Sequence, residues 1–97
     1  METVRFRWVE EGFTMRLRTE DISARTIGGE TIVLDLPSSQ YFAITGVGSR
    51  VFQLLAEDRT LDDLVAAITA EYEVDEPTAR RDVESFVDRL RQARLLA

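Results

Sequence analysis

Apolar and polar residues alternate in three short stretches of the first half of the chain. Residues 30–36 and residues 40–44 show the period of two that a half-buried strand requires, and residues 22–27 show it more weakly. Turn-forming residues lie between them: Gly28-Gly29, where both positions tolerate positive φ, and the run Pro37-Ser38-Ser39. The pattern predicts an antiparallel meander whose third strand, residues 40–44, is an edge of the sheet.

The second half of the chain has the period of amphipathic helices. Apolar residues recur at this spacing from 47 to 55, from 61 to 72 and from 79 to 90. Thr60 with Asp63 resembles a capping box, and Asp75 followed by Pro77 is typical of a helix start. The expected fold class is therefore α+β, with a three-stranded antiparallel sheet packed on a three-helix bundle in the order βββααα.

Composition narrows the chemistry. The chain has 97 residues, enough for one core, and it contains no cysteine, no histidine and no lysine. Thiolate chemistry, the usual neutral-pH general base, the commonest metal ligand and Schiff-base formation are therefore unavailable. We expect a protein that is not an enzyme and binds no cofactor and no metal. With no membrane-length apolar run and no signal-peptide pattern, we expect it in the cytoplasm, without a membrane partner.

The net charge of −6 is unevenly distributed. Residues 30–76 hold ten acidic residues against Arg50 and Arg59, whereas residues 77–97 hold five arginines against three acidic residues. Proteins that bind duplex DNA normally present a dominant basic face, because phosphate neutralisation supplies most of their affinity. Nucleic acid is therefore not an expected partner, although a winged-helix DNA-binding regulator remains an alternative.

Several motifs, taken in order, resemble the PqqD-like family over residues 15–97. The last part of the match contains Glu71-Tyr72-Glu73-Val74-Asp75, before a third helix with Phe86 and Leu90. Thr45 and the turn Ser38-Ser39-Gln40 depart from the family pattern. The motifs of the first part are Val33-Leu34-Asp35, Tyr41-Phe42-Ala43-Ile44, Gly48 and Val51-Phe52-Gln53-Leu54-Leu55.

The resemblance implies a winged helix-turn-helix-like module of the kind called a RiPP recognition element. Such modules bind the leader of a ribosomally made precursor peptide, which adds as a strand to the third strand and lies against the third helix. The chain looks closest to the stand-alone proteins of lasso-peptide pathways, whose partners include a leader-removing cysteine protease and other maturation enzymes. A precursor chaperone for a radical enzyme, as in pyrroloquinoline quinone synthesis, is the alternative branch.

The expected peptide site has two walls. One is the third strand, through its backbone and the Tyr41 side chain, and the other is a flank of the third helix. At 100° per residue with Val83 at zero, Ala79, Phe86 and Leu90 form a core stripe, and Val87 lies beside it with charged neighbours. The alternative is that Val87 belongs to the core and the charges are solvated. The predicted peptide-binding residues are Gln40, Tyr41, Phe42, Ala43, Ile44, Arg80, Val83, Glu84, Val87 and Arg91.

Residues 1–14 form a separate arm in this interpretation. Residues 2–9 alternate like a strand, and Phe6, Trp8 and Phe13 are large aromatic side chains. The arm could add a strand to the sheet, pair with a second copy to give a homodimer, occupy the peptide site as a mimic, stay disordered, or precede a true start at Met15. A structural adaptor whose sheet edge pairs with its own copy is the third functional class.

Overall fold

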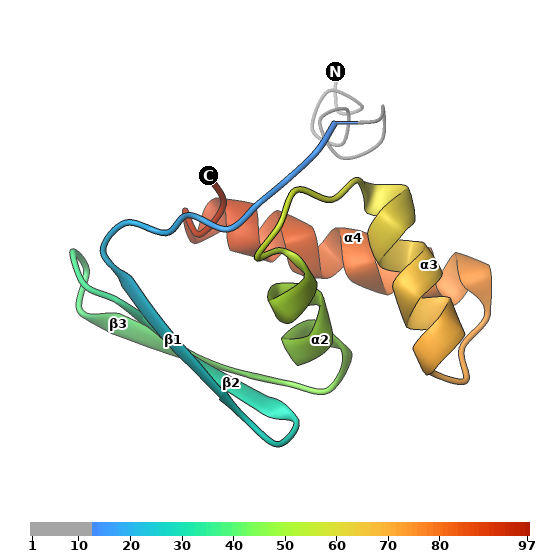
Figure 1. The fold of residues 1–97 in the computed structure, drawn as a ribbon, viewed down its shortest axis with the longest axis horizontal. Coiled ribbons are helices and arrows are strands. Elements are labelled where there is room, and N and C mark those ends of the chain that lie inside the picture. The colour runs from blue at the N-terminus through green and yellow to red at the C-terminus, as the bar shows by residue number, and fades with distance from the viewer. Residues whose placement is uncertain (1–12) are drawn as a thin grey trace.

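The computed structural model describes residues 13–97 and has the expected order of three strands followed by three helices (Figure 1). The α+β fold class is thereby confirmed. The strand expected within residues 2–9 lies outside the described residues, so the arm at 1–14 stays a prediction. The elements are β1 (Ile22–Ile27), β2 (Glu30–Asp35), β3 (Gln40–Thr45), α2 (Val47–Leu54), α3 (Leu61–Glu71) and α4 (Glu76–Gln92).

The sheet is an antiparallel meander in the order β1-β2-β3, which places β3 at an edge as predicted. A two-residue turn joins β1 to β2, and Gly28 in it has φ of 63°, a conformation that a Cβ disfavours. The turn from β2 to β3 contains Ser39 with φ of 58°, and the Ser39 N–H donates to the Leu36 carbonyl oxygen. Both turns return the chain directly, so the register of the sheet is set locally.

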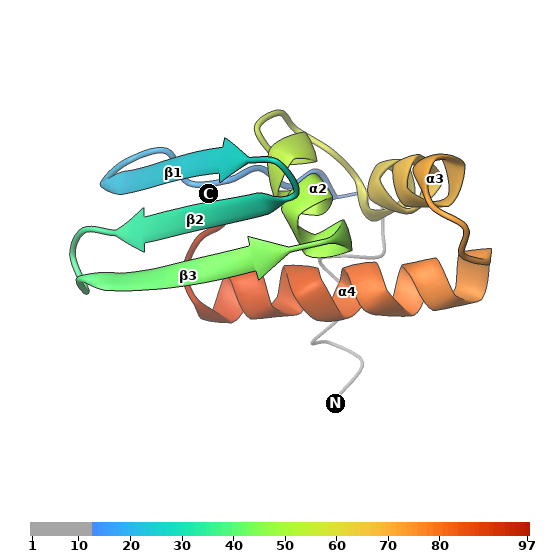
Figure 2. The ribbon, with the colours of Figure 1, turned by 90° about the horizontal axis from the view of Figure 1, so that it is seen from below.

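The two faces of the sheet have different environments. On β2, Thr31, Val33 and Asp35 are buried toward the helices, whereas Ile32 and Leu34 are exposed on the outer face. Figure 2 shows β3 lying between β2 and α4, with the sheet and α4 roughly side by side. The sheet is therefore covered by helices on one face only.

The core lies between α2, α3, α4 and the inner face of the sheet. Leu55, Leu64, Ile68, Val83 and Val51 are almost completely buried in it. A hydrogen bond of 2.7 Å between the hydroxyls of Thr31 and Ser49 ties β2 to α2 within this core. Because both hydroxyls are buried, each satisfies the other where water is excluded.

The predicted helix caps are present. Thr60 accepts a hydrogen bond from the Asp63 N–H, and the Asp63 carboxylate accepts one from the Thr60 N–H, which completes a capping box. Asp75 accepts a hydrogen bond from the Thr78 N–H, with Pro77 in the first turn of α4. Within residues 13–97, no helix is both long enough and apolar enough to cross a membrane.

Asp35 joins the end of β2 to the segment that precedes the sheet. The Ser38 hydroxyl donates to Asp35 Oδ2 over 2.6 Å, and the Arg18 guanidinium pairs with Asp35 Oδ1. The Ser38 hydrogen bond and the Arg18 contact both lower the pKa of Asp35. Asp35 is therefore a charged group that the folded state stabilises.

The core assignment predicts a large difference between two leucine variants. Leu64 is 0% exposed and Leu36 is 53% exposed. Leu64→Ala should reduce the free energy of unfolding by about 2–5 kcal/mol, because it removes buried contacts and leaves a cavity. The matched variant Leu36→Ala should change it by less than about 0.5 kcal/mol. Denaturant unfolding followed by circular dichroism measures both, and equal losses would contradict this assignment of the core.

The Asp35 contacts predict a stability that depends on pH. A carboxyl with a lowered folded pKa stabilises the fold above its unfolded pKa of about 3.9, and this contribution is lost as pH falls through the lower, folded pKa. Asp35→Asn should therefore destabilise the protein at pH 7 and much less at pH 3. Denaturant unfolding at both pH values measures the difference, with exposed Glu20→Gln as the control. The interpretation fails if Asp35→Asn costs as much at pH 3 as at pH 7.

Candidate functional site

The outer backbone edge of β3 is available for pairing. The Gly46 N–H donates to the Gly29 carbonyl oxygen, and hydrogen-bonded pairs alternate along an antiparallel ladder, so Ile44, Phe42 and Gln40 share their backbone bonds with β2. The intervening residues of β3, which are Tyr41, Ala43 and Thr45, direct their N–H and C=O groups away from β2. Within residues 13–97, no strand pairs with them.

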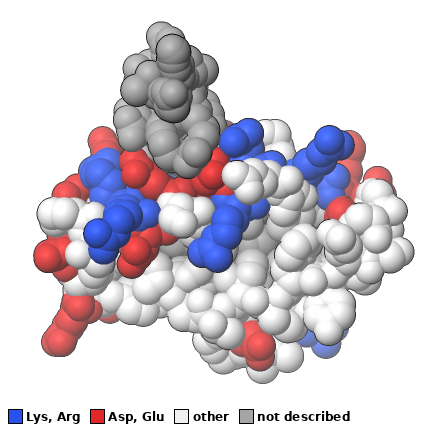
Figure 3. All heavy atoms as spheres, turned by 180° about the vertical axis from the view of Figure 1, so that it is seen from behind, with Lys and Arg blue, Asp and Glu red and all other residues white. Residues whose placement is uncertain are grey.

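A groove of about 510 Å³ runs between this edge and α4. Its apolar side chains come from the inner face of β3 and from the buried side of α4, with Phe42, Ile44 and Phe86 among them. Figure 3 shows the molecule from behind Figure 1, with charged side chains mainly in the upper part and a broad, mostly uncharged area below, where the sheet lies. The complete lining is Phe42, Ala43, Ile44, Thr45, Val47, Gly48, Val51, Asp82, Val83, Phe86, Arg89, Leu90, Ala93 and Leu95.

Gly48 allows the two walls of the groove to lie close together. It lies in the first turn of α2, which begins two residues after β3 ends. A Cβ at this position would lie 3.0 Å from Ile44 Cγ2 and 3.0 Å from Phe86 Cε1. Such distances are shorter than normal carbon contacts, so only glycine allows this approach without displacement of the wall residues.

The chemistry of the groove is apolar with two charged residues from α4. Asp82 and Arg89 are both exposed and both line it. Within residues 13–97, no group of three or more carboxylates could hold a metal ion. The groove therefore offers apolar contacts, two opposite charges and a row of unpaired backbone groups, which together suit an extended peptide.

The structure corrects the predicted flank of the third helix. Val87 is 0% exposed and belongs to the core, and Arg80 donates hydrogen bonds to Asp62 of α3 and to Glu76. Arg91 lines a smaller hollow with Thr14, Met15, Leu96 and Ala97. The expectation that Arg80, Glu84, Val87 and Arg91 face the sheet edge is wrong, because this flank of α4 packs toward α3 and the segment around Met15.

The flank that does face β3 contains Asp82, Phe86, Arg89 and Ala93. These residues lie at about −60° to −120° on the wheel centred on Val83. The helical periodicity assigned Phe86 to the core stripe. Without Phe86, the other residues of this flank include no large apolar side chain, so the sequence did not predict it as a wall of the groove. The close approach of Gly48 to Phe86 is a contact between distant segments that spacing along the helix does not reveal.

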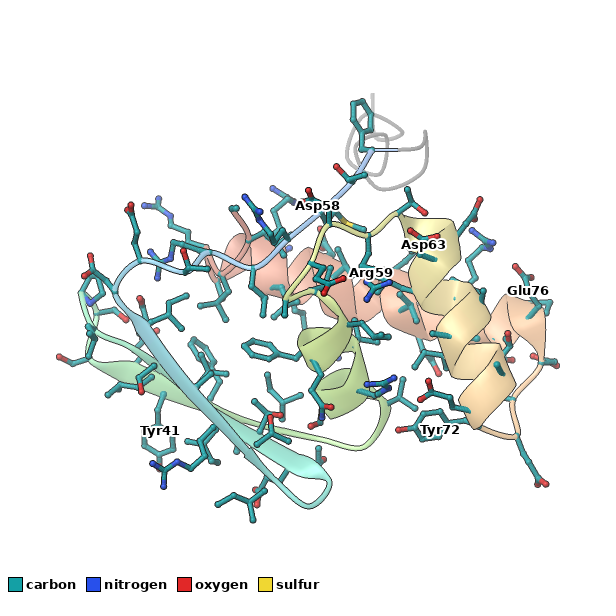
Figure 4. The ribbon with its side chains drawn as sticks, in the orientation of Figure 1. Tyr41, Asp58, Arg59, Asp63, Tyr72 and Glu76 are labelled. Carbon is teal, nitrogen blue, oxygen red and sulfur yellow. The ribbon has the colours of Figure 1, made fainter. Side chains whose placement is uncertain are left out.

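The predicted residues of β3 divide between the two faces of the sheet. Phe42 and Ile44 are partly buried and line the groove, and Val83 lines it from α4. Tyr41 is 71% exposed and points away from the helices on the outer face (Figure 4). Contact of any of these residues with a peptide stays a prediction.

The outer face of the sheet is also apolar. Besides Tyr41, it exposes Ile27, Ile32, Leu34 and Leu36. Tyr41 and Ala43 on this face alternate along β3 with Phe42 and Ile44 in the groove. The edge of β3 is therefore the place where an apolar surface and an apolar groove meet.

The fold and much of the sequence have known counterparts. The sequence profile of the family described as "Coenzyme PQQ synthesis protein D (PqqD)" matches residues 30–96. A solved structure described as "TbiB1 in Complex with the TbiA(beta) Leader Peptide" is similar at 36% identity and a TM-score of 0.77, over 84% of this chain and 94% of that one. Another, "Lasso peptide synthetase B1 complexed with the leader peptide", has 26% identity and a TM-score of 0.74, over 86% and 96% respectively. No curated protein matches the chain.

Proposed function

Since the chain belongs to the PqqD family, we propose that it binds the leader segment of a ribosomally made precursor peptide of the lasso type. The observation that carries the proposal is the position of the β3 edge, whose unpaired backbone groups lie beside an apolar groove. Both similar structures are described as complexes with a leader peptide, which supports the same class of ligand here.

The proposed mode of binding is strand addition to β3. The leader's backbone pairs with Tyr41, Ala43 and Thr45, and its alternate side chains enter the groove against Phe42, Ile44 and Phe86. Backbone hydrogen bonds supply sequence-independent affinity, and the groove supplies selectivity. The other edge of the sheet, on β1, also has no strand partner within residues 13–97, but the apolar groove lies beside β3.

The proposed role is presentation and not catalysis. The chain contains no histidine, cysteine or lysine, and the groove has one carboxylate and one guanidinium as its charged groups. The one hydroxyl among the lining residues belongs to Thr45, and the groove has no histidine or lysine that would act as a general base to activate it. The bound leader would instead be delivered to a leader-removing protease and other maturation enzymes.

Strand addition predicts a specific effect of proline at the edge. Ala43→Pro removes an N–H that faces away from β2, so the ladder between β2 and β3 should survive while one hydrogen bond to an added strand is lost. Binding of the TbiA(beta) leader peptide, measured by fluorescence anisotropy, should weaken at least about fivefold, since one net hydrogen bond contributes about 1 kcal/mol.

Ala43→Ser is the matched control, because it keeps the N–H at the same exposed position. It should bind the leader like the wild type. Circular dichroism establishes whether each variant is folded. Wild-type binding by a folded Ala43→Pro variant would rule out pairing at β3, and a wild-type protein with no affinity for the leader would rule out the proposed function.

The groove predicts a second effect, at Phe86. Phe86→Asp places a charge on the apolar wall that the leader side chains would contact, and binding should weaken roughly 10- to 100-fold. Tyr72→Asp is the control, because Tyr72 is an exposed aromatic residue outside the groove. Isothermal titration with the same leader peptide measures both variants, and equal effects would contradict the assignment of the groove.

A further inference from the structure

The two charged residues of the groove, Asp82 and Arg89, form few ion pairs with the rest of the described protein. Arg89 has no ion pair within residues 13–97, and Asp82 has one contact of 4.0 Å with Arg81 between two largely exposed side chains. Most arginines of this part of the chain do pair with carboxylates. Those with an ion pair are Arg16, Arg18, Arg50, Arg59, Arg80, Arg81 and Arg91.

Arg89 is distinguished from the other unpaired arginines by its position. Arg25 and Arg94 also lack an ion pair among the described residues, but neither lines the groove. A guanidinium beside an apolar groove loses part of its water when a peptide covers it, and this loss is offset best by a carboxylate. The same argument applies with opposite sign to Asp82.

The order of these charges along the groove follows from the direction of the elements. β3 and α4 run antiparallel (Figure 2), so Asp82 lies toward the Thr45 end of β3 and Arg89 toward the Gln40 end. Seven residues of helix separate them, which is about 10 Å along the axis. In a strand that rises about 3.4 Å per residue and turns alternate side chains to one face, this distance corresponds to about two or four residues.

We propose that Asp82 and Arg89 select leader peptides by charge and direction. The leader that fits has a basic side chain toward Asp82 and, two or four residues later, an acidic side chain toward Arg89. This order assumes that the added strand runs antiparallel to β3, which is the slightly more stable pairing. The inference rests on the proposed function and names the peptide class that the groove accepts.

A charge scan of the TbiA(beta) leader tests the proposal. Each leader position is replaced in turn by Glu and by Lys, and the affinities are measured with the wild type, with Arg89→Glu and with Asp82→Lys. Arg25→Glu on β1 and Glu73→Lys after α3 are the matched controls, because they change the net charge equally and lie outside the groove.

With the wild type, we expect Glu at one leader position to bind about three- to tenfold more tightly than Lys, and Lys at an earlier position to bind more tightly than Glu. This range is typical of ion pairs between exposed and partly desolvated side chains. Arg89→Glu should reverse the first preference alone, and Asp82→Lys the second alone. The proposal is overturned if the preferences survive both substitutions, change equally in the controls, or occur in the opposite order along the leader. If the unmodified leader does not bind the wild-type protein at all, the proposed function itself is refuted.

Discussion

The site depends on one constraint, which is the short connection between β3 and α2. α2 begins two residues after β3 ends, and its first turn lies against both Ile44 and Phe86 because Gly48 has no side chain. The last strand of the sheet and the longest helix of the fold are thereby held at a fixed separation. A groove of about 510 Å³ lies between these two elements, lined by apolar side chains from both.

This arrangement also explains how an exposed sheet edge is controlled. An unprotected edge pairs with other strands and promotes aggregation. Here α4 runs beside β3, and in the proposed mode of binding an incoming chain pairs with the backbone of Tyr41, Ala43 and Thr45 and fits its side chains against Phe86 at the same time. In that proposed mode, the helix makes a general pairing site selective. The apolar outer face around Ile32 and Leu34 of β2 continues onto β3, so a strand added to β3 would extend this face.

The sequence sufficed for the elements, the caps and the edge position of β3, because these follow from local periodicity and turn chemistry. It did not suffice for the flank of α4 that forms the groove. The centre of the predicted core stripe of α4 lies about 25° from the centre of the residues that are buried, and Val87 and Phe86 lie on opposite sides of it. Which of them is buried depends on Gly48 and on the packing of α3 against Arg80, and both are contacts between distant segments.

Amide hydrogen exchange of the protein with and without the TbiA(beta) leader tests the central claim most directly, because it reports the backbone of β3 residue by residue. The N–H groups of Phe42 and Ile44 already pair with β2, so they should be protected in both states. The N–H groups of Tyr41, Ala43 and Thr45 should exchange freely in the unbound protein and become protected when the leader binds. Protection that appears on β1 instead, or binding that leaves these three amides unchanged, would contradict strand addition to β3.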